Sequence, residues 1–273
     1  MQMKNILTTG ILALASLALV TTSAQAAPYV DGDLFLGFRA TGGVGNTNAY
    51  LINIGNFAQY RDATTAGFAL ALGNIKADLD ATFTGWATRS DVRWGVFGTA
   101  QLWDDAVTAH VLYGTKPEAT IGVTPTAWAR RSEFNQSVTS GKVVNLSLQY
   151  QIDSNTVNSP VGVIENTSES NDWTEFMPGG SQSTASTAFA IYSPTIEGNF
   201  GAGTAGTRLD LFQLLPGSGA GSYKGYFSIV DTPGGTTVSY KGTNIVPEPT
   251  SALLLGMGAC LLGLVRRRKS VTA

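Results

Sequence analysis

Short apolar runs, separated by clusters of glycine, asparagine and aspartate, dominate the middle of this 273-residue chain. Runs of this length between turn-forming residues predict β-strands. We expect nine strands, at residues 33–40, 49–54, 91–99, 106–113, 142–152, 186–192, 207–215, 223–230 and 236–240. The first pair and the last pair each enclose a glycine-containing turn and predict hairpins. The pattern favours a mainly β fold, an antiparallel sandwich or jelly-roll-like domain.

The clearest alternation of apolar and polar positions lies in residues 142–152. Val144, Leu146, Leu148 and Tyr150 would share one face of a half-buried strand. The flanking stretches carry prolines and many polar residues. We interpret residues 115–141 as irregular, and residues 153–184 as a long surface excursion.

One short helix is expected after Asn74, which can act as its N-cap. Ile75, Leu79 and Phe83 recur at a spacing of four and form its apolar stripe, which Trp86 can extend. Two acidic residues, Asp78 and Asp80, are two positions apart and so point in nearly opposite directions. They cannot hold a metal together, and we expect a solvated face.

The first 26 residues have the layout of a secretory signal peptide. Lys4 supplies the positive charge, residues 6–20 form the apolar segment, and Ala24 and Ala26 occupy the small-residue positions of a cleavage site. We place the cut before Ala27 and expect passage through the Sec translocon. An uncleaved N-terminal membrane anchor is the alternative.

The last 28 residues, 246–273, contain three parts in order. They are the extended segment Pro247-Glu248-Pro249, which we call the proline knuckle, an apolar run and a basic cluster. Residues 251–265 carry no charge and are followed by Arg266, Arg267, Arg268 and Lys269. Fifteen residues are fewer than the roughly 17 to 25 of a usual membrane span, but snorkelling arginines can extend a marginal transmembrane helix. The positive charges would keep that flank cytoplasmic. A buried core helix is the alternative, which the lack of a polar face disfavours.

This combination resembles the PEP-CTERM sorting signal of exported Gram-negative proteins, over about a tenth of the chain. By that resemblance Pro247, Glu248 and Pro249 are the motif that exosortase, a membrane-embedded cysteine transpeptidase-like enzyme, recognises and cleaves. The resemblance implies an inner-membrane intermediate, followed by a cell-surface or extracellular location. The chain would then divide into a signal peptide (1–26), an exported β-rich domain (27–245) and the sorting signal (246–273).

Charge and cysteine content narrow the partners. Setting aside Lys4 and the four tail cations leaves 12 basic against 19 acidic residues. This mildly acidic balance argues against nucleic acid, because phosphate binding needs a basic face. The single cysteine, Cys260, lies in the apolar tail, where we interpret it as an apolar filler, with lipidation as the alternative. The exported domain therefore has no disulfide and depends on its hydrophobic core.

Catalytic chemistry is difficult to assemble from these residues. His110 is the sole histidine and falls within a predicted strand, so neither a Ser-His-Asp site nor a zinc site has its usual groups. We expect no enzyme activity, no cofactor and no metal. Two alternatives stay open: calcium at the adjacent carboxylates Asp104 and Asp105, where we expect a plain turn, and a paired-carboxylate glycosidase. The candidate carboxylates for that pair are Glu165, Glu169, Asp172 and Glu175.

Two function classes remain. One is a non-catalytic protein of the cell surface or extracellular matrix, and the other is a surface-displayed domain that binds or hydrolyses carbohydrate, with extracellular polysaccharide as its partner. An exposed row of tryptophans would favour the second class. The residues to inspect are Trp86, Trp94, Trp103, Trp128 and Trp173. Trp128 could stack a sugar beside Arg130 and Arg131, or could cover the edge of a sheet.

Overall fold

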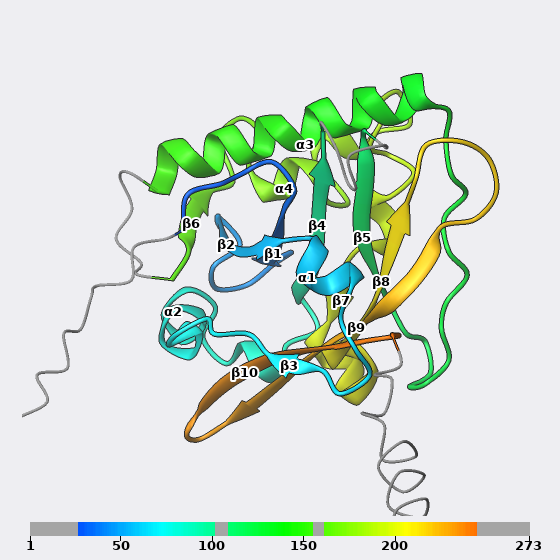
Figure 1. Cartoon of the computed structure of the whole chain (residues 1–273). Helices are drawn as coiled ribbons and strands as arrows, with labels where there is room; N and C mark the ends of the chain where they lie inside the picture. Colours follow the sequence, from blue (N-terminus) through cyan, green and yellow to red (C-terminus); the bar gives the residue numbers. More distant parts are fainter. Residues whose placement is uncertain (1–26, 102–108, 155–160, 245–273) are drawn as a thin grey trace, which may run out of the picture.

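A single curled antiparallel sheet organises the part of the chain that this computed structural model describes, residues 27–101, 109–154 and 161–244. Figure 1 shows the elements, with helix α3 lying across one side of the sheet. The strands within the described residues are β1 (Asp33–Ala40), β2 (Asn48–Asn56), β3 (Phe68–Ala69), β4 (Val92–Ala100), β5 (Val111–Pro117), β6 (Val163–Asn166), β7 (Gly198–Asn199), β8 (Arg208–Leu214), β9 (Ser222–Thr232) and β10 (Gly235–Gly242). The α-helices are α1 (Ala58–Arg61), α2 (Ile75–Thr82), α3 (Glu133–Ser154) and α4 (Trp173–Phe176).

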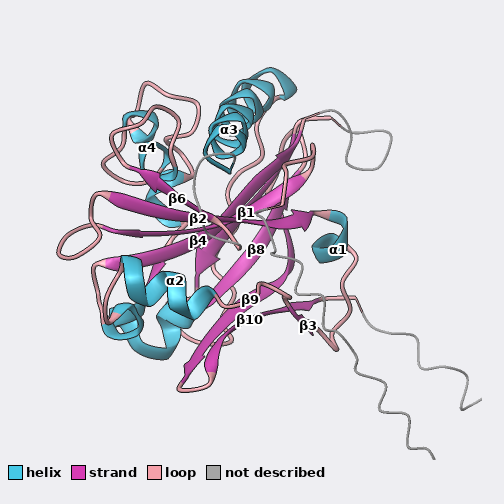
Figure 2. Cartoon of the chain, turned by 90° about the vertical axis from the view of Figure 1, so that its left-hand side faces the viewer, coloured by secondary structure: helices cyan, strands magenta, loops and turns pink. Residues whose placement is uncertain are grey.

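The strand order is β3-β10-β9-β8-β5-β4-β1-β2-β6, and β7 adds to β4. Both predicted hairpins are confirmed, since β1 pairs with β2 and β9 pairs with β10. Figure 2 shows the sheet bent into a half-barrel. The mainly β expectation is confirmed, whereas the sandwich or jelly roll is wrong because one continuous sheet replaces two facing sheets.

Both faces of the sheet are apolar, which explains why no second sheet is needed. Within β1, Leu34, Leu36 and Phe38 point into the concave core, while Phe35 points into a second core on the other face. Helix α2 packs against both β2 and β10 and so covers the concave side. Helices α3 and α4 cover the other face. Each face of the sheet buries its side chains against helices and loops. One core therefore lies inside the curl of the sheet, and the second core lies between its outer face and helices α3 and α4.

The segment with the clearest strand pattern, residues 142–152, is a correction, because it lies in the 22-residue helix α3. Val143, Leu146 and Tyr150 are buried at spacings of three and four, as on one face of a helix. A second stripe faces outward and is also apolar; it includes Leu148 and Ile152. Two helical stripes on opposite faces together mimic an alternation of period two, and this produced the wrong prediction. The expectation of only one helix is wrong for the same reason.

The helix also has a start signal that the analysis of periodicity overlooked. The Oγ of Ser132 accepts a hydrogen bond from the Asn135 amide at 3.4 Å, and the Ser132 carbonyl accepts one from the Gln136 amide. Serine is a favoured residue at this N-cap position. Residues 133–141 are therefore helical and not irregular as predicted.

The predicted surface excursion, residues 153–184, is wrong in part. It contains the edge strand β6 and the short helix α4, whose Trp173 and Phe176 are buried. The Trp173 indole lies directly on Gly37 of β1, where any side chain would collide with the ring. Glycine at that position thus allows a polar stretch to dock on the sheet.

Two predicted strands need correction. Residues 186–192 form turns in which the amides of Ala190 and Tyr192 bond to carbonyls three residues earlier. Phe189 and Tyr192 consequently face the same core, which is a helical and not a strand spacing. The strand predicted at 106–113 begins at Val111; residues 102–108, including Trp103, Asp104 and Asp105, lie outside the described residues.

The predicted helix at residue 75 is confirmed, with Ile75, Leu79 and Phe83 buried. Asn74 occupies the N-cap position but its side chain makes no capping hydrogen bond. The solvated acidic face is wrong in part. Asp78 accepts a hydrogen bond from the Tyr50 hydroxyl at 2.6 Å, and Asp80 accepts one from the Trp86 indole at 3.0 Å.

Within the described residues, every helix is too short or too polar to cross a membrane. The transmembrane helix and the signal helix predicted for the two ends lie outside the described residues.

Candidate functional site

An exposed row of tryptophans would favour carbohydrate binding, but the four tryptophans that the structure describes are buried. Trp86, Trp94 and Trp173 are at most 1% exposed, and Trp128 is 7% exposed. Each indole nitrogen is engaged, for example that of Trp128 with the Thr195 hydroxyl at 3.0 Å. These four rings therefore belong to the cores and do not form an exposed row.

The two arginines next to Trp128 donate hydrogen bonds to backbone carbonyls of two different loops. Arg130 donates to the carbonyls of Leu215 and Pro216, and Arg131 donates to the carbonyl of Ala188. The Lys116 ammonium lies 4.5 Å from the centre of the Trp128 ring. Of the two predicted roles, covering the sheet is the one that this geometry supports.

Two of the candidate carboxylates, Glu165 and Asp172, lie near each other in the fold, and both accept hydrogen bonds from backbone amides. Glu165 of β6 accepts from the Trp173 amide, and Asp172 caps α4 by accepting from the amides of Thr174 and Glu175. Burial raises the pKa of Glu165 well above its ordinary value, and the negative charge of Asp172 raises it further. Burial also raises the pKa of Asp172 to about 6. These two carboxyls hold the α4 turn in place.

The other two carboxylates in that set have other surroundings. Glu175 accepts from the Asn171 amide and the Ser181 hydroxyl, and Glu169 lies in an exposed turn. In the part of the chain that the structure describes, no three His, Cys, Asp or Glu side chains are grouped to hold a metal ion.

A second carboxyl pair, Glu118 and Asp210, was missed by the sequence analysis. Glu118 directly follows β5 and Asp210 lies in the neighbouring strand β8; they are 2% and 0% exposed. Arg208 Nε lies 2.5 Å from a Glu118 oxygen. Burial, followed by a hydrogen bond to Glu118 and its charge, raises the pKa of Asp210 to about 7. The available signal was an aspartate between two leucines, Leu209 and Leu211, in the strand at residues 208–214.

This pair does not have the geometry of a glycosidase. Retaining and inverting enzymes hold their two carboxyls roughly 5 to 9.5 Å apart so that the glycosidic bond or a water fits between them. Glu118 and Asp210 are in direct hydrogen-bond contact and buried. Both carboxyls lie inside the fold, where a sugar cannot reach them.

His110 is not the mid-strand residue that the sequence predicted. It precedes β5 in a bend, with a left-handed backbone φ of 56°. Such a conformation is uncommon outside glycine and marks the chain reversal into β5.

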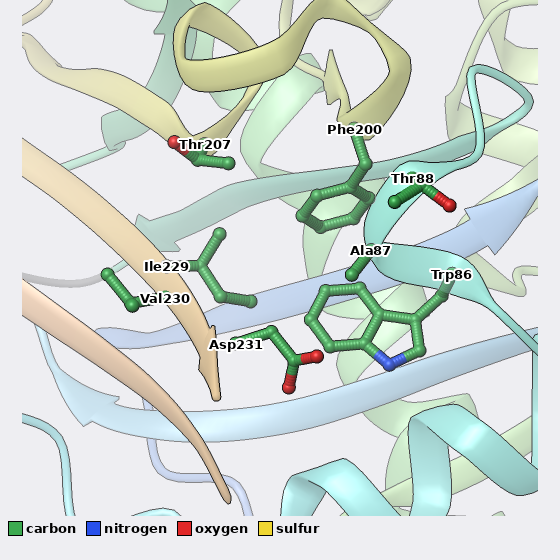
Figure 3. Close-up of a pocket in the computed structure, with 8 residues that line it drawn as sticks. All are labelled: Trp86, Ala87, Thr88, Phe200, Thr207, Ile229, Val230 and Asp231. Carbon is green, nitrogen blue, oxygen red and sulfur yellow. The ribbon is translucent and has the colours of Figure 1, made fainter. Parts of the chain in front are cut away.

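An open cavity of about 480 Å³ lies on the concave side of the sheet, between β9 and the 3-10 helices η1 (Trp86–Thr88) and η4 (Phe200–Thr207). Its lining is mostly apolar: Trp86, Ala87, Thr88, Phe200, Thr207, Ile229, Val230 and Asp231. Figure 3 shows the Asp231 carboxylate beside the Trp86 ring, and the Phe200 ring packs edge-on against that indole with the ring centres 4.8 Å apart. The carboxylate accepts from the Lys76 ammonium and from the Thr236 hydroxyl.

The described domain ends at Asn244, which is fastened to the fold. Its amide bonds to the Ala63 carbonyl, and its carbonyl accepts from the Thr65 amide at 2.9 Å. Pro247 follows three residues later, so at most about 11 Å of extended chain separates it from the folded edge. A protein that reads the proline knuckle must therefore work close to the sheet.

Comparison with known families identifies this C-terminal segment. A family described as the PEP-CTERM protein-sorting motif matches residues 246–269. The chain therefore carries the mark of an exported protein that exosortase sorts, and PEP-CTERM proteins are directed to the cell surface. Searches among curated proteins and among solved structures returned no match for this chain.

The matched segment spans Pro247, Glu248 and Pro249 as well as the basic cluster at 266–269. These residues lie outside the described residues, as do Ala24 and Ala26, so their individual roles stay predictions. Ala27 is described, and its carbonyl accepts from the Tyr150 hydroxyl at 3.2 Å. A cut before Ala27 would leave that contact intact.

Proposed function

We propose that this chain is a non-catalytic protein of the cell surface or extracellular matrix, displayed there through its PEP-CTERM signal. The observation that carries the proposal is the sorting motif at residues 246–269, directly behind the fastened strand β10. Two further features support it. The tryptophans that the structure describes are packed in cores, and the buried carboxyl pairs are engaged within the fold.

The proposed route has two steps. The Sec translocon exports the chain, and signal peptidase cuts before Ala27. The apolar segment 251–265 then holds an inner-membrane intermediate, with the basic cluster cytoplasmic by the positive-inside rule. Exosortase would read Pro247, Glu248 and Pro249 on the outer side, with the folded domain close to the membrane because of the short spacer.

We expect exosortase to remove the tail. In cells that contain the enzyme, intact-mass spectrometry should show a C-terminus within or near residues 247–249; without it, the residues beyond the motif should remain. Replacing both Pro247 and Pro249 with alanine should nearly abolish processing, because the extended knuckle is lost.

Neutral residues in place of Arg266, Arg267, Arg268 and Lys269 should also impair processing, because the tail would lose its orientation. The matched control is Lys241→Gln, an exposed cation of β10 outside the motif, which should be processed normally. An identical C-terminus with and without exosortase would remove the sorting proposal. Normal processing of the neutral tail would contradict the charge argument alone.

The alternative function is a surface-displayed carbohydrate-binding domain, and the cavity beside Trp86 favours it. Its volume of about 480 Å³ falls in the usual range for small-molecule sites, roughly 300 to 1,000 Å³. Two threonines and one carboxylate in an otherwise apolar lining could accept a sugar ring. Hydrolysis is the weaker version of this alternative, since the carboxyls of both pairs are buried and engaged within the fold.

If the cavity binds polysaccharide, Val230→Arg should abolish the binding by filling the cavity mouth. Val230 is 56% exposed, so the change should leave the fold intact. The measurement is retardation of the purified protein in a gel that contains extracellular polysaccharide from the producing cells. Val30→Arg, at a residue that is 63% exposed and outside the cavity, is the matched control. Equal retardation of Val230→Arg and the wild type would place any binding elsewhere.

A further inference from the structure

Helix α3 carries an apolar stripe on the face that points away from the sheet. Four large apolar side chains there are well exposed: Phe134 by 76%, Val138 by 42%, Leu148 by 51% and Ile152 by 59%. Figure 1 shows the helix lying along the outside of the molecule. Soluble proteins seldom leave aligned apolar side chains uncovered without a binding partner.

The spacing of this outer stripe is regular. Phe134, Val138, Gly141, Asn145, Leu148 and Ile152 follow one another at intervals of 4, 3, 4, 3 and 4 residues. This average of 3.6 is the period of a straight α-helix, so the six residues stay on one face along its length. From Phe134 to Ile152 the outer stripe is about 27 Å long at 1.5 Å per residue.

The outer stripe is also symmetric about Val143. Phe134 and Ile152 each lie nine positions from that residue, Val138 and Leu148 five, and Gly141 and Asn145 two. An identical helix laid antiparallel across this centre would therefore place Phe134 against Ile152 of the second copy. Val138 would meet Leu148 of that copy, and Gly141 would meet its Asn145.

The middle of the outer stripe suits close approach. No atom lies within 4 Å of the position that a Gly141 side chain would take, so the backbone there is open to another helix. Asn145 of a second copy supplies a small polar side chain to fill that space. Lys142 is the only charged residue from 134 to 152, and its long stem can carry its ammonium to solvent.

We propose that a second copy of this chain docks antiparallel on the outer stripe, forming a dimer with twofold symmetry. The self-complementary order of large and small residues is what an isologous interface requires. A membrane surface is disfavoured, because helices that lie on membranes carry several basic residues on their polar face. The opposite face of α3 packs against the sheet and is buried, with Val143 and Tyr150 beside Gln136 and Ser140, so it offers no basic face to lipid.

Disulfide trapping tests the pairing directly, because Cys260 is the only natural cysteine. In the full chain with Cys260→Ser, purified in mild detergent, the double variant Val138→Cys/Leu148→Cys should form disulfide dimers on mild oxidation. The two single variants should not, because identical positions lie about 15 Å apart along an antiparallel pair. Both sites are exposed, so unfolding midpoints should match the parent protein.

Sedimentation velocity provides the second measurement. The Leu148→Asp variant should sediment as a monomer where the wild type is a dimer. The Val123→Asp variant, changed at a loop residue that is 60% exposed and outside α3, should remain a dimer. A wild-type monomer at all concentrations would overturn the proposal. Equal trapping of the single and double variants would show a parallel pair and overturn it also. Dimers that appear only after residues 1–26 are removed would support it, with the leader as a competing occupant of the stripe; binding only to lipid vesicles would replace it.

Discussion

Replacing Arg39 with methionine is expected to lower the free energy of unfolding by about 3 to 5 kcal/mol, the cost of breaking a buried ion pair. Arg39 of β1 donates to both oxygens of Glu197 at 2.9 to 3.0 Å, and the two side chains are 4% and 1% exposed. Without the guanidinium, Glu197 would keep the Trp173 indole as its one remaining donor among the bonds described here. A buried carboxylate would then be left without a compensating charge.

Urea unfolding followed by tryptophan fluorescence measures this loss. The double variant Arg39→Met/Glu197→Gln should recover much of it, because it removes the stranded charge and keeps an acceptor for Trp173. The matched control is Arg61→Met, which breaks an exposed pair with Asp62 and should cost less than about 1 kcal/mol. A small loss for Arg39→Met, equal to that of the control, would show that the ion pair contributes little.

The domain is expected to lose stability as the pH rises from about 4 to about 8, contrary to the usual behaviour of acidic proteins. Asp210 has a pKa raised to about 7 and Asp172 one raised to about 6, and the pKa of Glu165 is raised as well. A carboxyl with a raised folded-state pKa keeps its proton in the fold but loses it in the unfolded chain near pH 4. The stabilisation from the protonated carboxyl is therefore complete below about pH 4. It is lost progressively as the pH rises from about 4 to the pKa of the group in the folded protein. The loss should reach a few kcal/mol, at about 1.4 kcal/mol for each unit between the two pKa values.

Asp210→Asn isolates the part of this slope that comes from the Glu118 and Asp210 pair. The amide can donate to Glu118 as the protonated acid does, without a charge that titrates. Urea unfolding at pH 4.5, 6 and 7.5 should show the variant equal to the parent at pH 4.5 and more stable at pH 7.5.

Asp62→Asn is the control for this measurement, since Asp62 is 61% exposed and a hydrogen bond from Arg61 lowers its pKa. It should not change the slope above pH 5. If Asp210→Asn lost stability equally at every pH, Asp210 would be ionised and paired with Arg208, and the raised pKa of Asp210 would be wrong.

The two carboxyl sites also bear on function. Each consists of acids withdrawn from solvent and bonded to neighbouring strands or backbone amides, so each stabilises the fold at low pH. A surface protein with such a profile would withstand acidic surroundings outside the cell. This is consistent with the proposed structural role, which needs persistence and not catalysis.

Some of the elements that depend on residues close together in the sequence were predicted correctly. The hairpins β1/β2 and β9/β10 followed from short apolar runs around glycine turns, because such turns match the twist of antiparallel strands. The helix at Ile75 followed from its apolar stripe. Helix α3 was missed because its outward stripe is apolar too, and a pattern with two stripes resembles a strand.

The site residues show the same division. Glu165 and Asp172 were candidates from the sequence, yet only the fold shows that they hold the start of α4. Glu118 and Asp210 are 92 positions apart and meet because β5 and β8 are neighbours in the sheet. Strand order depends on long-range pairing, which the hydrophobic pattern of one strand does not encode.

The amino-acid sequence by itself determined the address of this protein, because a sorting signal is read as a short linear segment with its own charges and apolar length. It also determined that the exported part is mainly β. Only the tertiary structure decided that one curled sheet, and not two, buries the aromatic residues, and that an outer helix leaves an apolar stripe uncovered. The reason is that burial on both faces of a sheet is a property of what packs against it, and the packing partners come from distant parts of the chain.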